Sequence, residues 1–176
     1  MRLFIATWPS PEVVEALKAM PRPAVEGVRW TRPDQWHVTL RFLGQVPDPG
    51  VVLAGLTGLG GLGPPVVARA GPATAVLGSV LCVPVGGLEG LASAVCRATA
   101  GVGGYQEHRP FRGHITVARV QGRPGRGRGR ASRLEPMAGL GLDASWEVDR
   151  VSLVSSQTRP EGSRYEVLAE VALGAA

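Results

Sequence analysis

His37-Val38-Thr39-Leu40 and His114-Ile115-Thr116-Val117 share one pattern, in which histidine, an apolar residue, threonine and an apolar residue follow one another. Alternation of polar and apolar residues with a period of two predicts a half-buried β-strand. Residues i and i+2 of a strand point to the same face, so each segment presents an imidazole beside a hydroxyl. Two such strands side by side would place two histidines and two threonines around one small pocket. These groups suit acid–base chemistry on a phosphate.

The chain has three histidines, and two of them carry threonine two residues later. The alternative interpretation makes His37 and His114 structural residues on two strand faces. The third histidine, His108, has no such threonine and stands beside Arg109. We predict that it is an exposed loop residue, because polar residues between predicted elements usually lie on the surface.

The segments around the two patterns also repeat. Residues 1–6 predict a strand, and Ser10 with Pro11 is typical of the start of a helix that extends to Met20. In the second half, residues 80–83 predict a strand, and apolar residues at helical spacing predict a helix over 88–99.

Each predicted helix is followed by a loop and then by one of the histidine strands. The order strand, helix, loop, strand therefore occurs twice and indicates an internal duplication. We expect an α+β fold that forms a single domain over residues 1–176. Its two lobes would be related by a pseudo-twofold axis, with antiparallel-rich sheets lining a central cleft and helices packed outside.

These motifs resemble those of the two-histidine (2H) phosphoesterase superfamily, and within it the RNA 2′,3′-cyclic phosphodiesterases historically called 2′-5′ RNA ligases. The matching residues cover most of the chain: Met1–Ala6, Val28–Trp30, Pro33, His37–Gly44, His114–Arg119, Val151–Leu153, Ser155 or Ser156, Gly162 and Tyr165. The chain departs from the family in two places. It has Gly113 where the family often has proline before the second histidine, and the segment after Val120 is unusual.

The resemblance implies an enzyme that hydrolyses RNA 2′,3′-cyclic phosphate ends to 2′-phosphomonoesters, with no metal and no other cofactor. It implies that His37 protonates the leaving O3′ and that His114 activates water. Thr39 and Thr116 would bind the non-bridging phosphate oxygens, where charge builds in the transition state. Reverse 2′-5′ joining of RNA ends stays open by microscopic reversibility.

Three further residues are candidate substrate contacts. Arg119 lies five residues after His114, where the family carries a phosphate-contacting arginine. An odd spacing on a strand points it to the opposite face, so it reaches the pocket only if the strand ends, twists or bulges first. The alternative for Arg119 is a solvated charge at a strand end. Phe42 and Tyr165 are candidates for stacking on a base, and core packing is the alternative for Phe42.

Two other functions stay open. The first is a phosphodiesterase acting on another small cyclic or 2′-5′-linked nucleotide. The second is a non-catalytic RNA-binding protein, although binding alone would not need paired imidazoles. An ATP-dependent ligase is disfavoured, because the chain has no Gly-Lys-Ser/Thr phosphate loop and Lys18 lies on a predicted helix.

The composition agrees with an RNA partner. The formal net charge of +5 suits a polyanion, although the arginine-rich, glycine-rich composition is also typical of GC-rich coding. Cys82 and Cys96 are too few for a metal cage, and Cys96 falls on the predicted apolar stripe of its helix, which predicts a buried free thiol. The few cysteines favour a reduced compartment, so we expect a cytoplasmic protein, and we expect it to be a monomer. We expect no membrane partner, because no stretch approaches the ~20 apolar residues that span a bilayer.

One segment has no apolar periodicity. Residues 121–130 are mostly glycine and arginine, and they predict a mobile loop at the end of the second histidine strand. One interpretation is a basic flap that contacts RNA phosphates through Arg123, Arg126, Arg128, Arg130 and Arg133. The other is a solvated loop with a drifted composition. Among the tryptophans, Trp8 is expected at the cleft rim and Trp30, Trp36 and Trp146 in the core or at the rim.

Overall fold

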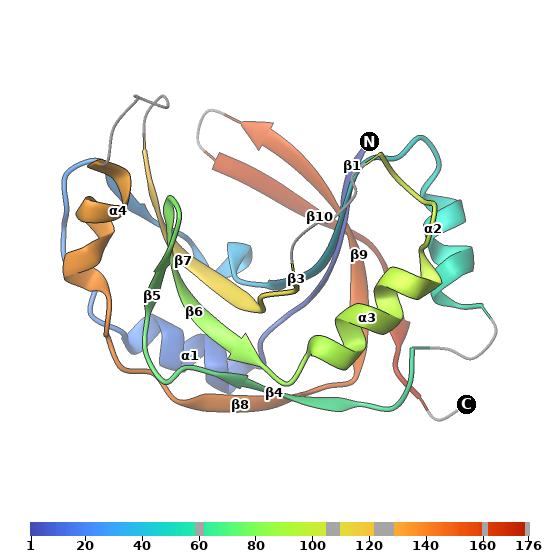
Figure 1. Ribbon diagram of the computed structural model, residues 1–176, viewed down its shortest axis with the longest axis horizontal. Coiled ribbons are helices and arrows are strands. Elements are labelled where there is room, and N and C mark those ends of the chain that lie inside the picture. Colours follow the sequence, from blue (N-terminus) through green and yellow to red (C-terminus); the bar gives the residue numbers. More distant parts are fainter. Residues whose placement is uncertain (59–61, 105–109, 122–128, 160–161, 175–176) are drawn as a thin grey trace.

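A computed structural model describes residues 1–58, 62–104, 110–121, 129–159 and 162–174 (Figure 1). The strands are β1 (Arg2–Thr7), β2 (Val28–Trp30), β3 (Val38–Gln45), β4 (Val66–Ala70), β5 (Ala75–Leu77), β6 (Val80–Gly86), β7 (His114–Val120), β8 (Ala144–Val148), β9 (Arg150–Arg159) and β10 (Gly162–Ala172). The helices are α1 (Pro11–Ala19), α2 (Pro49–Leu56), α3 (Glu89–Ala98) and α4 (Gly129–Leu134), with 3-10 turns η1 (Pro33–Gln35) and η2 (Glu135–Met137).

The strands form one curled, antiparallel sheet in the order β10-β9-β1-β3-β7-β6-β4-β8, with β2 also beside β7 and β5 beside β6. Figure 1 shows two halves that meet at β3 and β7. The predicted duplication is visible as β1-α1-β3 in one half and β6-α3-β7 in the other, each with its first strand paired to its histidine strand. The predicted α+β fold with two lobes and an antiparallel-rich sheet is therefore confirmed.

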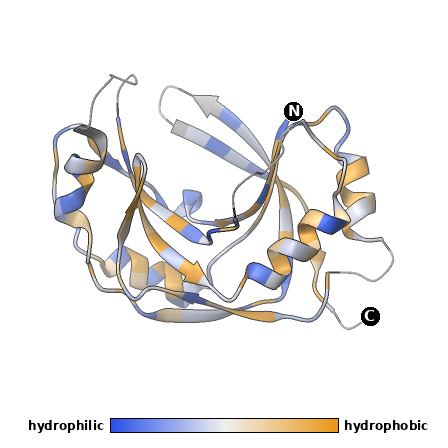
Figure 2. Cartoon of the chain, in the orientation of Figure 1, coloured by the Kyte–Doolittle hydropathy of each residue, from blue (hydrophilic) through white to orange (hydrophobic). Residues whose placement is uncertain are grey.

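Helix α1 begins as the sequence predicts. Ser10 precedes the first turn, and its hydroxyl accepts a hydrogen bond from the Val13 amide at 3.5 Å, with Pro11 at the first helical position. Val13 and Leu17 are buried against the core. In Figure 2 the hydrophobic colour gathers on the central strands and helices, whereas the outer part of the β9–β10 hairpin is pale or hydrophilic.

Helix α3 buries Leu91, Ala92 and Val95, and here one prediction is wrong. Cys96 is exposed rather than buried. It follows Val95 directly, and one residue turns an α-helix by about 100°, which carries Cys96 away from the buried face. Cys82 on β6 is buried, and this burial raises the pKa of its thiol to about 11.

Strands β3 and β7 share one described backbone pair, between Val38 and Ile115. These are the second residues of the two histidine motifs, and both side chains are fully buried. Because side chains alternate along a strand, the residues on either side of this pair point to the opposite face, away from the core. The pairing therefore centres both motifs on one point of the sheet.

The first motif is followed by a β-bulge. In the pairing of β1 with β3, Ile5 lies opposite Arg41 and Ala6 lies opposite Thr39. Leu40 is therefore an extra residue on β3, and it interrupts the alternation of side chains. Arg41 points away from the motif face, and its guanidinium donates to the Cys96 carbonyl at 2.8 Å, near the end of α3.

The second motif is followed by an equivalent bulge. In the pairing of β6 with β7, Leu81 lies opposite Ala118 and Cys82 lies opposite Thr116. Val117 is the extra residue, and both Val117 and Ala118 are buried. The residue after them returns to the face that carries Thr116. The two strands thus repeat a local irregularity as well as a sequence pattern.

The basic segment ends differently from the prediction. Residues 122–128, with Arg123, Arg126 and Arg128, lie outside the described residues, as does His108. The sequence predicts a loop that extends to residue 130. This end is wrong, because helix α4 begins at Gly129. Leu134, at the end of α4, is fully buried and anchors this helix to the core. Arg133 is exposed on it.

Within the described part of the chain, no helix combines the length and the apolarity that crossing a membrane requires.

Replacing Ile115 by alanine should lower the free energy of unfolding by about 2–5 kcal/mol, because the change leaves a cavity at the junction of the two halves. Val167→Ala is the matched control, since Val167 is an exposed aliphatic residue on β10. It should change the free energy by less than about 0.5 kcal/mol. Urea unfolding measures both. Equal, small effects would show that the junction is not a packed part of the core.

Candidate active site

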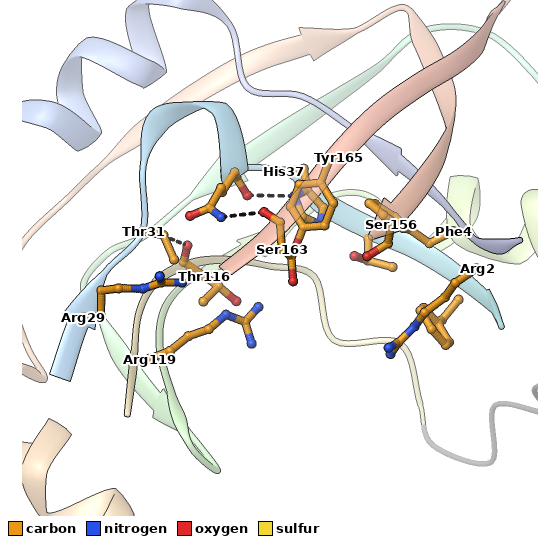
Figure 3. A pocket seen from close by; sticks show the side chains of 13 residues that line it. Arg2, Phe4, Arg29, Thr31, His37, Thr116, Arg119, Ser156, Ser163 and Tyr165 are labelled. Atoms are coloured by element: carbon orange, nitrogen blue, oxygen red, sulfur yellow. Dashed lines mark hydrogen bonds between the residues drawn. The ribbon is translucent and has the colours of Figure 1, made fainter. Parts of the chain in front are cut away.

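A cavity of about 340 Å³ lies over the junction of β3 and β7, and side chains from β1, β2, β3, β7, β9 and β10 enclose it (Figure 3). Its lining consists of Arg2, Phe4, Arg29, Thr31, Gln35, His37, Thr39, Phe42, Thr116, Arg119, Ser156, Ser163 and Tyr165. Six of the seven residues that the sequence indicated are present: His37, Thr39, Phe42, Thr116, Arg119 and Tyr165.

The seventh, His114, is not among the described lining residues. It is the first residue of β7, two residues before Thr116 and on the same face of the strand. Antiparallel pairing at Val38 and Ile115 brings β7 past β3 with His114 next to Thr39. His114 is near enough for its charge to lower the pKa of His37. It therefore stands at the edge of the cavity.

The bulges decide which later residues reach the cavity. Phe42 and Arg119 each follow their histidine by five residues, and an unbroken strand would point both away from it. The extra residue in each strand reverses this, so both side chains line the cavity. The sequence predicts that Arg119 reaches the pocket only if the strand ends, twists or bulges before it, and the structure has such a bulge at Val117.

The two imidazoles are held in the same way. His37 Nδ1 lies 2.8 Å from the Gln35 carbonyl oxygen, and His114 Nδ1 lies 2.8 Å from the Arg112 carbonyl oxygen. A carbonyl oxygen can only accept, so Nδ1 carries the hydrogen in both rings. In the neutral form, Nε2 of each ring then has the free lone pair. This arrangement leaves Nε2 of each histidine available for proton transfer.

Three aromatic rings surround His37. Their centroids lie 5.0 Å (Phe4), 5.5 Å (Trp8) and 4.9 Å (Tyr165) from the imidazole centroid. Burial in this site lowers the pKa of His37 to about 4, against the opposing effect of the Gln35 hydrogen bond, and the charges of Arg119 and His114 lower it further. His37 is therefore neutral at pH 7 in the ligand-free protein.

Buried polar contacts fix the frame of the site. The Thr31 hydroxyl donates to the Thr116 carbonyl at 2.8 Å and accepts from the Trp36 indole at 2.9 Å. The Gln35 side-chain amide donates to the Ser163 carbonyl at 2.9 Å, which ties β10 to the turn before His37. These contacts couple β10 and β7 to the segment that enters β3, so both motifs share one support.

A second contact fixes the Trp8 ring. Its indole donates to the Ser152 hydroxyl at 3.1 Å. Trp8, which the sequence predicts at the cleft rim, lies half-buried against the His37 ring. Trp36 and Trp146 are buried, as predicted.

The cavity is strongly cationic. Arg2, Arg29 and Arg119 line it, and the lining contains no aspartate or glutamate. The Arg2 guanidinium lies 4.9 Å from the centroid of the Phe42 ring. Among the described residues, no group of three or more His, Cys, Asp or Glu could hold a metal ion. The charge and the donors therefore fit an anion with several oxygens.

Several of these lining residues could not be recognised as site residues from the sequence. Arg2 and Arg29 lie on predicted or matched segments but have no chemical pattern of their own. Ser156 and Ser163 come from β9 and β10, far from either motif in the sequence. The β9–β1 pairing brings them to the site, and only the tertiary structure shows that pairing.

Gly113 has a structural reason. A Cβ at this position would clash with the Val85 carbonyl oxygen, and the Val85 amide donates to the Gly113 carbonyl at 2.8 Å. The edge of β6 thus approaches the chain closely just before His114. Any larger residue, proline included, requires β6 to move away. Glycine therefore suits this chain where the family often has proline.

The stability of the protein should depend on His37 below neutral pH. The pKa of His37 is lower in the folded state than the 6.5 of an unperturbed histidine, so unfolding takes up a proton between these values. The free energy of unfolding therefore keeps its full value with respect to His37 above pH 6.5. It falls by an amount on the order of 3 kcal/mol as the pH decreases toward 4. Urea unfolding of the wild type and His37→Gln between pH 4 and 7 measures it. Parallel pH profiles for the two proteins would contradict it.

Known proteins share this architecture. The family model described as LigT like phosphoesterase matches residues 8–61 and 83–165. The structure of TT0787 from Thermus thermophilus is 28% identical, covers 98% of both chains and has a TM-score of 0.75. E. coli LigT complexed with 3′-AMP is 26% identical over 98% of this chain and 97% of that chain, with a TM-score of 0.69. No curated protein matches the chain.

The matched residues span more than half of the chain and include both histidine motifs, the frame residues Thr31 and Gln35, and Tyr165. The resemblance of the sequence to the 2H phosphoesterases is therefore confirmed, and with it a phosphoesterase activity. The chain belongs to the LigT-like family of the 2H phosphoesterase superfamily.

Proposed function

We propose that this phosphoesterase hydrolyses RNA 2′,3′-cyclic phosphate ends to 2′-phosphomonoesters without a metal. One observation carries the proposal. Two histidine–threonine pairs flank the single Val38–Ile115 pair, beside a cavity with three arginines and no carboxylate in its lining. A cyclic phosphodiester carries one negative charge and needs a proton acceptor on one side and a proton donor on the other. The two imidazoles can supply both. The protein's partner is then the end of an RNA chain.

The reaction uses the two Nε2 atoms. One histidine removes a proton from water as the water oxygen attacks phosphorus, and the bond from phosphorus to O3′ breaks. The other histidine gives its proton to O3′, so the products are a 3′-hydroxyl and a 2′-phosphate. The hydroxyls of Thr39 and Thr116 donate to the non-bridging oxygens, where negative charge increases in the transition state. Arg119 supplies a fixed positive charge for substrate phosphate.

The family resemblance assigns the acid role to His37 and the base role to His114. His37 is neutral in the empty site, so it must gain a proton when the substrate binds. The negative charge of the phosphate provides the reason, because it opposes the effect of the nearby Arg119 charge and favours the imidazolium. His114, two residues before the cavity residue Thr116, is then the base that activates the attacking water.

The ligands of one relative fit this substrate class. E. coli LigT has been crystallised with 3′-AMP and with NADP+. The first is a ribonucleotide with a 3′-phosphate, and the second carries a 2′-phosphate on its adenosine ribose. A 2′,3′-cyclic phosphate end has one phosphate bonded to both of these ribose oxygens, O2′ and O3′. Both bound molecules thus support a nucleotide end as the substrate of this chain.

Base stacking is proposed for two residues. Tyr165 packs edge-on against His37 and Phe4, and Arg2 lies over Phe42. We expect a base to stack on one of these two rings, since bases stack on aromatic side chains with little sequence preference.

Residues of both halves line the cavity. We therefore propose that residues 1–176 form one domain.

EDTA should leave hydrolysis of a short RNA with a 2′,3′-cyclic phosphate end unchanged, since the imidazoles supply both proton transfers. Phosphorus NMR should identify the product as a 2′-phosphate. A rate that vanishes with chelator and returns with a divalent ion would overturn the metal-free mechanism. A 3′-phosphate product would overturn the proposed orientation of the substrate.

His37→Gln and His114→Gln should each lower kcat by ~10²-fold or more, because each removes a proton-transfer group. The glutamine side chain retains an amide group that can donate a hydrogen bond to the backbone carbonyl that binds Nδ1 of the histidine. A substrate with an activated leaving group in place of the 3′ oxygen needs no acid, so it should restore the rate of His37→Gln only. Restoration of His114→Gln instead would exchange the two roles. Normal RNA binding and near-normal turnover in both variants would favour another catalytic pair.

A further inference from the structure

The Gln35 side chain makes two hydrogen bonds that require an amide group. Its Oε1 accepts from the Arg32 backbone amide at 3.2 Å, and its Nε2 donates to the Ser163 backbone carbonyl at 2.9 Å. A backbone amide can only donate and a backbone carbonyl can only accept, so both ends of the Gln35 amide are assigned. The side chain therefore joins the residue before the 3-10 turn η1 to strand β10.

The backbone carbonyl of Gln35 holds the imidazole of His37. Nδ1 of His37 donates to this carbonyl at 2.8 Å, and the bond fixes the tautomer and the direction of Nε2. The carbonyl belongs to η1, a turn of three residues, and 3-10 hydrogen bonds have poorer geometry than those of an α-helix. Contacts from outside the turn are therefore needed to keep the carbonyl in one direction.

Strand β10 contacts His37 as well as Gln35. Tyr165 lies two residues after Ser163, so the two side chains share one face of β10, and both line the cavity. The Tyr165 ring packs edge-on against the imidazole, with 4.9 Å between the ring centroids. One strand thus supports His37 in two ways, directly through an aromatic ring and indirectly through the Gln35 side chain (Figure 3).

The duplication offers an internal comparison. His114 also donates from Nδ1 to the carbonyl two residues earlier, which is that of Arg112. Arg112 is exposed and lies outside the helices and strands, whereas Gln35 is half-buried within η1. The same backbone bond therefore holds both rings, and in the first half a side chain ties that backbone to another strand. This support belongs to the histidine that the proposed function makes the acid.

We propose that Gln35 is a positioning residue for His37, whose side chain fixes the carbonyl that orients the imidazole and so directs Nε2 at the leaving oxygen. This inference rests on the proposed function, in which His37 is the acid. It adds a residue that acts through another residue on one proton transfer. A catalytic group misplaced by about 1 Å can lower a rate by up to ~10²-fold, so loss of this support should be measurable.

Gln35→Met keeps the length of the side chain and removes both hydrogen bonds. With a short RNA that ends in a 2′,3′-cyclic phosphate, it should lower kcat about 10-fold and leave KM within about 2-fold, because the acid is misplaced and binding is kept.

Asp34→Ala is the matched control, because it removes the exposed ion pair with Arg32 from the same turn and no hydrogen bond of the Gln35 side chain. It should keep kcat within about 2-fold of the wild-type value, since exposed ion pairs contribute little. Equal losses of kcat in the two variants would overturn the proposal.

Two further rates separate positioning of the acid from a general loss of structure. A substrate with an activated leaving group in place of the 3′ oxygen needs no acid, so Gln35→Met should hydrolyse it as fast as the wild type. In the His37→Gln background, Gln35→Met should lower kcat no further, because both changes act on the same proton transfer. A merely structural role would lower both of these rates, and that result would overturn the proposal.

The ring nitrogens of the histidines give a measurement that does not depend on the reaction. Nitrogen NMR of the wild type at about pH 8, where unperturbed histidines are neutral, should show the hydrogen on Nδ1 of both His37 and His114. In Gln35→Met, a fraction of His37 should carry it on Nε2, whereas His114 should be unchanged. A lower kcat without this change at His37 would overturn the proposal.

The two measurements together distinguish the inference from the proposed function. If no cyclic phosphate is hydrolysed and the His37 tautomer still changes in Gln35→Met, the proposed reaction fails and the positioning role stands. If hydrolysis occurs and Gln35→Met matches the wild type in kcat and in its ring nitrogens, the positioning role fails and the reaction stands.

Discussion

A single backbone pair, Val38 with Ile115, determines where the chemistry of this protein can occur. Both side chains are fully buried, so the strands are held together by core packing at this point. Slipping the register by one residue would turn every motif side chain to the other face and bury the polar ones, which is costly. The packing of two aliphatic residues therefore fixes the positions of two histidines and two threonines.

The duplicated scaffold surrounds its two histidines differently. His37 lies among three aromatic rings, which removes water and lowers its pKa, whereas His114 stands at the edge of the cavity. Both rings donate from Nδ1 to the carbonyl two residues earlier, so the difference lies in the surroundings and not in the motif. An asymmetric reaction needs a proton donor and a proton acceptor. Identical motifs in unlike environments meet that need.

Much of this architecture could be predicted from the sequence because it depends on local patterns. The alternation around His37 and His114, the Ser10 cap and the repeated order of elements all reflect short-range physics, and the structure agrees with them. Cys96 shows the limit of such patterns. An error of one residue in a helical stripe is a rotation of about 100°, enough to exchange a buried side chain for an exposed one.

The parts that could not be predicted depend on pairing between distant segments. The bulges at Leu40 and Val117 arise from the register of β3 and β7 against their neighbours, and no local pattern announces them. Yet they decide that Phe42 and Arg119 enter the cavity. A bulge leaves one residue of its strand unpaired and reorients the side chains that directly follow it. Each half of the molecule therefore turns three side chains toward one face: the histidine, the threonine two residues later and the residue five positions after the histidine. A regular strand would turn only the histidine and the threonine of these three toward that face.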